Sequence, residues 1–247
     1  MRTISRISAA FQVLDSYSKG PVLGASVLVD GRRVRYVAKG DGTYVFTDLP
    51  LVPHVYEISA HGYCTVRITL PAAPIHFPEV VLLQHAPGGA FLGKIAYFRL
   101  RFSEGERPLG DACVRAVLRT NVGSLRLVAP AGAGERTLSL AGGYALGMLY
   151  QKCCPQSAPE ETVLLTGYDK AAGQYELQDP LTADLPQGTL LRPVWDLITD
   201  RDGVAILPAI GLFLQREEVE FTFSWKGKEQ QLMTAPPSPS LSAAVTF

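Results

Sequence analysis

The feature that most constrains the fold is the alternation of apolar and polar residues in the first 85 positions. Apolar side chains recur at every second position in short bursts, which is the pattern of strands with one buried face. The bursts are Phe11 and Val13; Ala25, Val27 and Val29; Val34 and Tyr36; Tyr44 and Phe46; Tyr56, Ile58 and Ala60; Val66, Ile68 and Leu70; Val80 and Leu82. This segment therefore predicts a small sandwich of seven antiparallel strands.

Turn residues separate these bursts. They include the Gly20-Pro21 pair and the glycines of Asp30-Gly31, Asp41-Gly42 and His61-Gly62. Glycine permits positive φ, and proline presets its own φ, so such pairs favour tight turns. No long helix is required to explain the pattern.

The same segment resembles a known domain. The stretches FQVLDSYSKGPVLGASVLVDG, KGDGTYVFTDLP and VYEISAHGY are similar to the carboxypeptidase regulatory-like domain, a transthyretin-type sandwich. The shared pattern is a strand, a Gly-Pro turn, an Ala-x-Val strand, an Asp-Gly-x-Tyr-x-Phe hairpin and a strand that ends in Gly-Tyr. The resemblance covers residues 9–85 and implies a seven-stranded module for packing and binding rather than catalysis.

The pattern recurs later in the chain. An offset of 87 places Phe11 on Phe98, and Ala25 on Ala112, whereas an offset of 165 places Tyr56 on Phe221. We interpret the chain as two copies of one sandwich. The first copy occupies residues 1–85, a linker follows at 86–90, and the second copy consists of residues 91–120 and 196–247.

The difference between the offsets indicates an insertion at residues 121–195. An insertion of this length is usually functional or has structure of its own. Its pieces RTLSL, ETVLLTGY, QYELQ and TLLRPV have the composition of strands, which predicts a small β-rich subdomain. These pieces also resemble short β modules of virion, phage-tail and tail-like particle proteins.

Charge and hydropathy exclude two classes of partner. The 23 Lys and Arg residues balance 23 Asp and Glu residues, so the chain lacks the positive field of a general nucleic-acid or anionic-membrane binder. The longest mostly apolar segment, residues 138–150, is shorter than the roughly 20 residues that a membrane span requires. We expect neither a nucleic-acid partner nor a membrane span.

The first residues and the cysteines indicate a compartment. Arg2, Ser5, Arg6 and Ser8 interrupt the apolar stretch that an export signal needs, so we expect no signal peptide. The four cysteines have no spacing typical of a disulfide framework: Cys64, Cys113, Cys153 and Cys154. This favours synthesis in the cytoplasm with reduced thiols.

No set of catalytic residues stands out. The sequence has no Gly-x-Ser-x-Gly elbow and no phosphate-binding Gly-x-x-x-x-Gly-Lys-Ser/Thr loop, and all four histidines precede residue 86. We therefore predict no catalytic residue, no cofactor and no enzymatic activity.

Three short patterns resemble parts of metal sites. His76 and Glu79 form the His-x-x-Glu of zinc carboxypeptidases, but no distant histidine follows to complete the site. The stretch 200–203 is half of a calcium loop without its downstream acid, so a simple Asp-Gly turn is expected. Cys153 and Cys154 have no later histidine to join, and we expect two small buried residues. No metal site is predicted.

A basic patch is the candidate contact region. Alternation places Arg33 and Arg35 opposite Val34 and Tyr36, which predicts a solvated strand face. The alternative is a contact with an acidic partner surface. The residues of this possible partner contact are Arg32, Arg33 and Arg35.

These observations favour a non-catalytic structural or adaptor subunit of a large assembly. The tail-like segments and the absence of an export signal suggest a contractile injection or phage-tail-like particle, made in the cytoplasm and released by lysis. Its partners would be protein subunits of the same particle, including copies of itself. The alternative is a carbohydrate or cell-surface binding module, although Phe221, Phe223 and Trp225 read as core rather than a sugar-stacking row.

Overall fold

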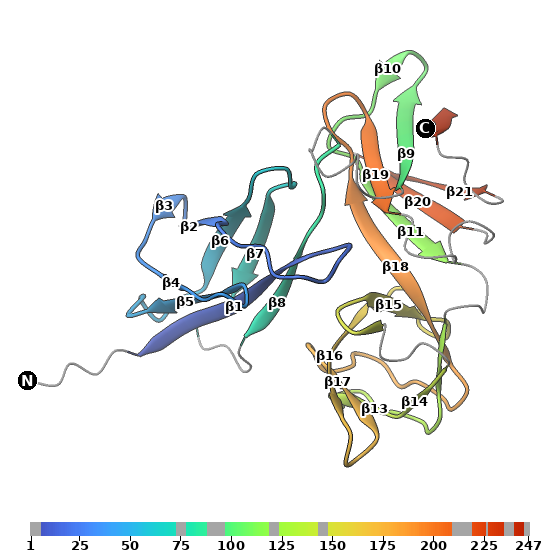
Figure 1. The fold of residues 1–247 in the computed structure, drawn as a ribbon. Helices are drawn as coiled ribbons and strands as arrows, with labels where there is room; N and C mark the ends of the chain where they lie inside the picture. The colour runs from blue at the N-terminus through green and yellow to red at the C-terminus, as the bar shows by residue number, and fades with distance from the viewer. Residues whose placement is uncertain are drawn as a thin grey trace, which may run out of the picture. The chain divides into compact units, whose positions relative to one another are not determined.

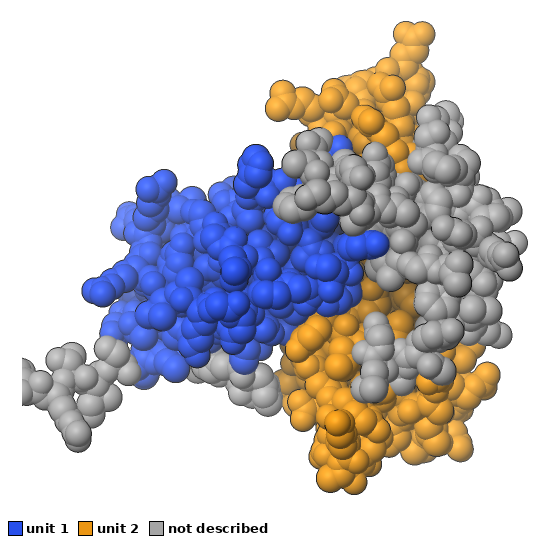
Figure 2. Space-filling view, viewed as in Figure 1, with its two compact units in different colours: residues 1–91 blue, residues 92–247 orange. Residues whose placement is uncertain are grey.

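The computed structural model describes residues 6–72, 78–87, 97–118, 124–142, 148–208, 219–225, 227–234 and 240–244. Within these ranges every regular element is a β-strand, which confirms the predicted all-β class (Figure 1). None of the described segments forms a helix that could cross a membrane. The chain divides into two compact units, residues 1–91 and residues 92–247 (Figure 2).

Unit 1 consists of two four-stranded sheets. One has the order β4 (Val37–Ala38), β5 (Thr43–Thr47), β1 (Ile7–Asp15) and β8 (Glu79–Leu83). The other has the order β3 (Arg32–Arg33), β2 (Ser26–Val29), β6 (His54–Ser59) and β7 (Val66–Leu70). A single apolar core draws residues from both sheets, as the alternating pattern predicts.

Aromatic rings fill the centre of this core. Phe11 lies 5.3 Å from Phe46 and 5.5 Å from Tyr56 between ring centroids, and these three side chains come from β1, β5 and β6. Each is buried to 2% exposure or less. Because the residues come from both sheets, their packing holds the two layers together.

The last strand of unit 1 differs from the expectation in direction and in register. β8 runs parallel to β1, whereas the sequence analysis predicts an all-antiparallel sandwich. Val13 pairs with Val81, so Val81 and Leu83 join the core in place of Leu82. The alternation alone does not determine this register, because two apolar residues at adjacent positions fit either face.

The segment around Val34 and Tyr36 is also not the strand that the pattern predicts. Both residues lie between β3 and β4, and their side chains pack against the core. Because β3 pairs with β2 and β4 with β5, this segment carries the chain from one sheet to the other. The Tyr36 hydroxyl donates a hydrogen bond to the carbonyl of Ala25, which fastens the crossing.

Unit 2 contains a small sheet and a large one. In the small sheet, β9 (Tyr97–Glu104) lies between β10 (Arg107–Pro108) and β19 (Val204–Pro208) and also pairs with β22 (Ser240–Ala244). The main path of the large sheet is β13 (Thr137–Leu138), β17 (Gln174–Leu177), β16 (Val163–Asp169), β15 (Lys152–Pro155), β18 (Leu190–Ile198), β11 (Cys113–Leu118), β20 (Val219–Trp225) and β21 (Lys228–Thr234). β12 (Leu125–Leu127) and β14 (Leu140–Ala141) join it beside β18.

The strand pairings of unit 1 recur in unit 2. β1 pairs antiparallel with β5 and parallel with β8, and β9 pairs in the same two ways with β19 and β22. The neighbours β2, β6 and β7 correspond to β11, β20 and β21. The register also agrees, because Val27 faces Ile58 and Val114 faces Phe223, which are the positions that the offsets of 87 and 165 relate.

The residues of β1 and β9 are not related by the offset of 87. The Val13 amide donates to the carbonyl of Gly42 at 2.9 Å, and the Phe102 amide donates to Gly203 at 2.8 Å. Phe102 is therefore the counterpart of Val13, an offset of 89 rather than the predicted 87 that aligns Phe11 with Phe98. The offset changes because the turn after β9 is two residues shorter than the turn after β1.

Two separate apolar cores stabilise unit 2. One comprises residues between Leu100 and Leu118 and between Leu197 and Phe223, and the other comprises residues between Leu125 and Leu191. β18 passes through both, because Leu191 belongs to one core and Leu197 to the other. The boundary expected at residues 195 and 196 thus falls inside a continuous strand.

Candidate functional site

The outer face of the large sheet of unit 2 carries a row of polar side chains. Along β11, Val114 and Ala116 enter the core, so Arg115 and Val117 lie on the opposite face. Strand register places Asp196, Arg115, Thr222 and Gln231 side by side across four strands. This row is assembled from segments that are far apart in the sequence.

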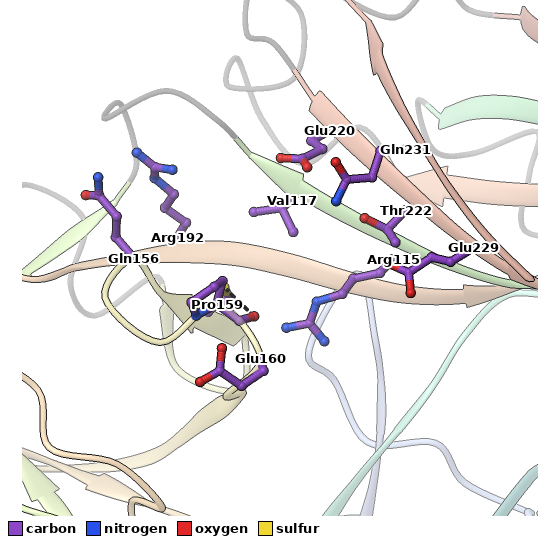
Figure 3. A pocket seen from close by; sticks show the side chains of 11 residues that line it. Arg115, Val117, Gln156, Pro159, Glu160, Arg192, Glu220, Thr222, Glu229 and Gln231 are labelled. Atoms are coloured by element: carbon purple, nitrogen blue, oxygen red, sulfur yellow. Dashed lines mark hydrogen bonds between the residues drawn. The ribbon is translucent and has the colours of Figure 1, made fainter.

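Residues between Cys154 and Arg192 border this face and form with it a cleft of about 660 Å³, a volume typical of ligand sites. Figure 3 shows Arg192 and Gln156 on one side of Val117, and Thr222 and Gln231 on the other. The lining residues are Arg115, Val117, Cys154, Gln156, Pro159, Glu160, Arg192, Glu220, Thr222, Glu229 and Gln231. The cleft is thus lined by β11, β20 and β21 and by residues from the segment between Cys154 and Arg192.

Arg115 is held from both sides of this joint. Its Nη1 lies 3.3 Å from Oδ1 of Asp196, and its Nη2 donates to the Thr162 hydroxyl at 2.9 Å. The other oxygen of Asp196 lies 3.0 Å from Nζ of Lys152. Because these groups are partly exposed, the pairs contribute little stability, and their main effect is to fix the position of the Arg115 guanidinium.

Cys154 and Arg192 pair across β15 and β18, so their side chains lie on the same face. The Cys154 thiol donates to the carbonyl of Pro159 at 3.2 Å. Burial raises the pKa of this thiol, although Arg115 acts in the opposite direction. A thiol with a raised pKa is a poor nucleophile, and Cys153 beside it is also buried. The cysteines serve packing here.

Arg192 differs from Arg115 in its partners. No described side chain forms an ion pair with Arg192, and its Nε is buried without a hydrogen-bond partner in the described part of the chain. A buried guanidinium donor is normally paired. The cleft therefore contains one fixed arginine and one whose donor is unsatisfied.

The predicted contact residues lie on unit 1, whereas the cleft is formed within unit 2. Arg32 and Arg33 form β3, Arg35 follows, and all three side chains are exposed. In the described residues, none of their guanidinium groups has a hydrogen bond or an ion pair. Their role in partner contact remains a prediction.

The suspected metal patterns form no cluster in the described residues, where no group of three or more possible ligands gathers. Asp200 instead closes a turn: its Oδ1 accepts the amides of Asp202 at 2.9 Å and Val204 at 2.8 Å. Glu79 begins β8, and His76 lies outside the described residues.

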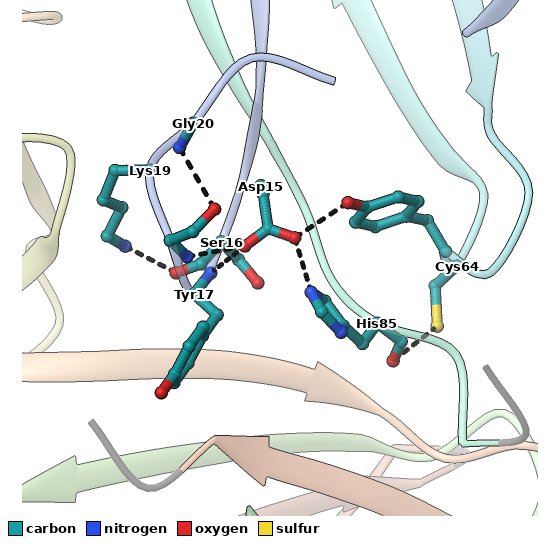
Figure 4. Close-up of polar contacts among 9 residues, drawn as sticks. Asp15, Ser16, Tyr17, Lys19, Gly20, Cys64 and His85 are labelled. Atoms are coloured by element: carbon teal, nitrogen blue, oxygen red, sulfur yellow. Dashed lines mark hydrogen bonds and ion pairs between the residues drawn. The ribbon is translucent and has the colours of Figure 1, made fainter. Parts of the chain in front are cut away.

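A buried polar cluster lies in unit 1 (Figure 4). Oδ2 of Asp15 accepts from the Tyr63 hydroxyl at 2.8 Å and lies 2.5 Å from Nε2 of His85, and Oδ1 accepts the amides of Tyr17 and Ser18. Burial alone would raise the pKa of Asp15, but the bonds from His85, Ser18 and Tyr63 hold it well below its usual range. The carboxylate is thus ionised and engaged by four donors, which suits a structural lock between β1, β8 and the β6–β7 turn.

Sequence reasoning identified none of the cleft residues as functional and assigned no functional role to His85. The alternation of Val114 and Ala116 in β11 is the one sequence signal that could have placed Arg115 on the outer face. Its partners Thr162 and Asp196 are 47 and 81 residues away, and Asp15 is 70 residues from His85. Such pairs depend on strand order, which the sequence pattern does not specify.

Comparisons with known proteins identify no family. No family model and no curated protein matches the sequence. One similar solved structure comprises the N-terminal four Ig domains of Dscam1 isoform 7.44, with 8% sequence identity and a TM-score of 0.13. The alignment covers 98% of this chain and 51% of that one, so the chain spans about half its length. At this TM-score the likeness carries no argument about fold or function.

Proposed function

We propose that this chain is a non-catalytic structural or adaptor subunit of a large protein assembly, of the contractile injection or phage-tail-like particle kind. In this proposal the chain consists of two transthyretin-like sandwiches related by duplication, and the second carries a docking subdomain. The recurrence of the pairings of β1 and β2 at β9 and β11 supports the duplication.

The observation that carries the proposal is the joint between the insertion and the sandwich. β18 pairs with β15 at Arg192 and with β11 at Asp196, so one continuous strand fixes the inserted subdomain to the sheet. The bond from Arg115 to Thr162 spans the same joint. A prebuilt cleft at a rigid joint suits recognition of a protein surface without rearrangement.

The chemistry of the cleft favours binding over reaction. Its lining combines arginine, glutamate and glutamine side chains, and the one thiol among its described lining residues is buried and hydrogen-bonded to Pro159. The three exposed arginines of unit 1 offer a second surface for an acidic partner. Glycan binding is the competing function, but none of the described residues that line the cleft supplies an aromatic ring for sugar stacking.

Sedimentation of a native lysate tests the proposal. We expect the chain, tagged in the cells that encode it, to pellet with a large particle and to co-purify with its structural subunits. The control replaces residues 119–192 with Asn-Gly, which removes the insertion but keeps both edges of the sandwich. Recovery of the intact chain only as a free monomer, or specific binding on a glycan array, would refute the proposal.

A further inference from the structure

We propose that the cleft of unit 2 binds a carboxylate, carried by an acidic side chain of an extended partner segment, with Arg192 as the charged hydrogen-bond donor. The inference rests on the proposed function for the identity of the partner as a protein. The inference adds the chemical group that the partner must present, which is a carboxylate.

The first support is the state of Arg192. Its Nε is buried and unpartnered among the described residues, and the carboxylate of Asp196, four residues further along β18, is engaged by Arg115 and Lys152. A guanidinium is always charged and matches a carboxylate with two parallel N–H donors. The group that best completes Arg192 is therefore an acid from outside the described chain.

The second support comes from the corresponding face of unit 1. There Glu57 on β6 and Arg67 on β7 form an ion pair at 2.6 Å, and Arg33 of β3, in the same cross-strand row, is exposed to solvent rather than buried. No insertion covers this face in the described residues. The unsatisfied arginine occurs on the copy whose outer face has become a cleft.

The other lining residues restrict the kind of anion. Glu160 and Glu229 are exposed at the cleft and repel polyanions such as nucleic acid or polyphosphate. Gln156, Gln231 and Thr222 offer amide and hydroxyl groups that suit the backbone of an extended peptide. A single carboxylate within an otherwise neutral or basic segment meets both conditions.

Peptide titration followed by NMR tests this inference on the full chain. The probes are the N-acetylated, C-amidated tripeptides Gly-Glu-Gly and Gly-Gln-Gly, which differ only in charge. We expect the Glu peptide to move the Nε–H signal of Arg192 in a saturable way and to bind about tenfold more tightly than the Gln peptide.

Two variants separate this site from general charge attraction. Arg192→Gln should weaken binding of the Glu peptide about tenfold or more, whereas Arg126→Gln, at an exposed arginine on β12, should leave it unchanged. Amide spectra of both variants report whether the fold is retained. Equal responses to the two peptides, no response of Arg192, or full binding by folded Arg192→Gln would overturn the inference.

Sedimentation then distinguishes this inference from the proposed function. If the native chain pellets with the particle and the peptides do not bind at Arg192, the ligand is wrong and the function stands. If the Glu peptide binds but the native chain never enters a particle, the site stands and the function fails. Loss of both Glu-peptide binding and particle entry in Arg192→Gln supports the two together.

Discussion

The buried carboxylate of Asp15 offers the sharpest test of how unit 1 is stabilised. In Asp15→Asn, an amide nitrogen takes the place of one oxygen and cannot accept a hydrogen bond. If this nitrogen takes the place of Oδ2, the bonds from Tyr63 and His85 are lost, while Oδ1 still accepts the Tyr17 and Ser18 amides. The substitution preserves shape and removes charge and accepting capacity.

The expected magnitude follows from these two bonds. Hydrogen bonds to a charged group contribute about 1.5–3 kcal/mol each, so the free energy of unfolding should fall by about 3–5 kcal/mol at neutral pH. For a unit of this size, that loss lowers its Tm by more than about 12 °C. Thermal and urea unfolding, followed by the near-UV signal of the unit 1 tyrosines, measure both quantities.

The pH dependence provides a second readout for the same variant. Because folding lowers the pKa of Asp15, its stabilisation is present above the ordinary value of 3.8 and is lost as pH falls through the folded-state pKa. The difference between wild type and Asp15→Asn should therefore shrink in acid. Asp48→Asn, at an exposed carboxylate, is the matched control and should change stability by less than about 0.5 kcal/mol. A loss at Asp15 no larger than the control would refute the reasoning.

Three further predictions concern other parts of the chain. Gly203→Ala should destabilise unit 2 by more than about 2 kcal/mol in urea unfolding, because φ is +70° and a Cβ would meet the backbone oxygen of Phe102. Gly105→Ala is the control, because its φ is +59° but a Cβ there would lie in open space, and it should lower the free energy of unfolding by less. Replacement of residues 119–192 by Asn-Gly should leave a folded unit with a cooperative unfolding transition, because no residue of the core between Leu100 and Phe223 comes from the replaced segment. An unfolded product would show that this core depends on the core between Leu125 and Leu191. The hydrogen bond to Asp30 raises the pKa of His54 above 6.5, so the stability that this pair contributes is complete below that value and is lost as pH rises through the folded-state pKa. A Tm that declines in wild type as pH rises above 6.5, but not in His54→Gln, would confirm the assignment, and parallel curves would contradict it.

Local sequence signals predicted most strands of unit 1 and their turns, the segment at 34–36 and the direction of β8 being the exceptions. Phe11, Tyr44 and Tyr56 lie in the core as their alternation predicts. The Asp-Gly pairs mark turns in both units, since Gly42 and Gly203 have positive φ beside the corresponding carbonyls of Val13 and Phe102. Period and turn chemistry are local properties, and a single sequence carries them.

Features that depend on strand order were not predictable. The parallel pairing of β8 decides that Val81 faces the core, and nothing in the apolar run of β8 specifies this register. The cleft depends on β18, which contributes Leu191 to one core of unit 2 and Leu197 to the other. Arg192 belongs to a strand that the sequence identified, but its unsatisfied donor becomes visible only when β15 and β11 take their places beside it.

The parallel pairing of β22 with β9 also governs the order in which the protein forms during synthesis. Arg99 faces Ser240, a partner that the ribosome adds 141 residues later, whereas the β1–β8 pair closes after fewer than 75 residues. Unit 1 can therefore mature while unit 2 still waits for its last strand, and β9 must stay protected from aggregation in the meantime. The segment between Leu125 and Leu191, with a core of its own, can fold within that interval and bring β11 and β18 together before β22 pairs with β9.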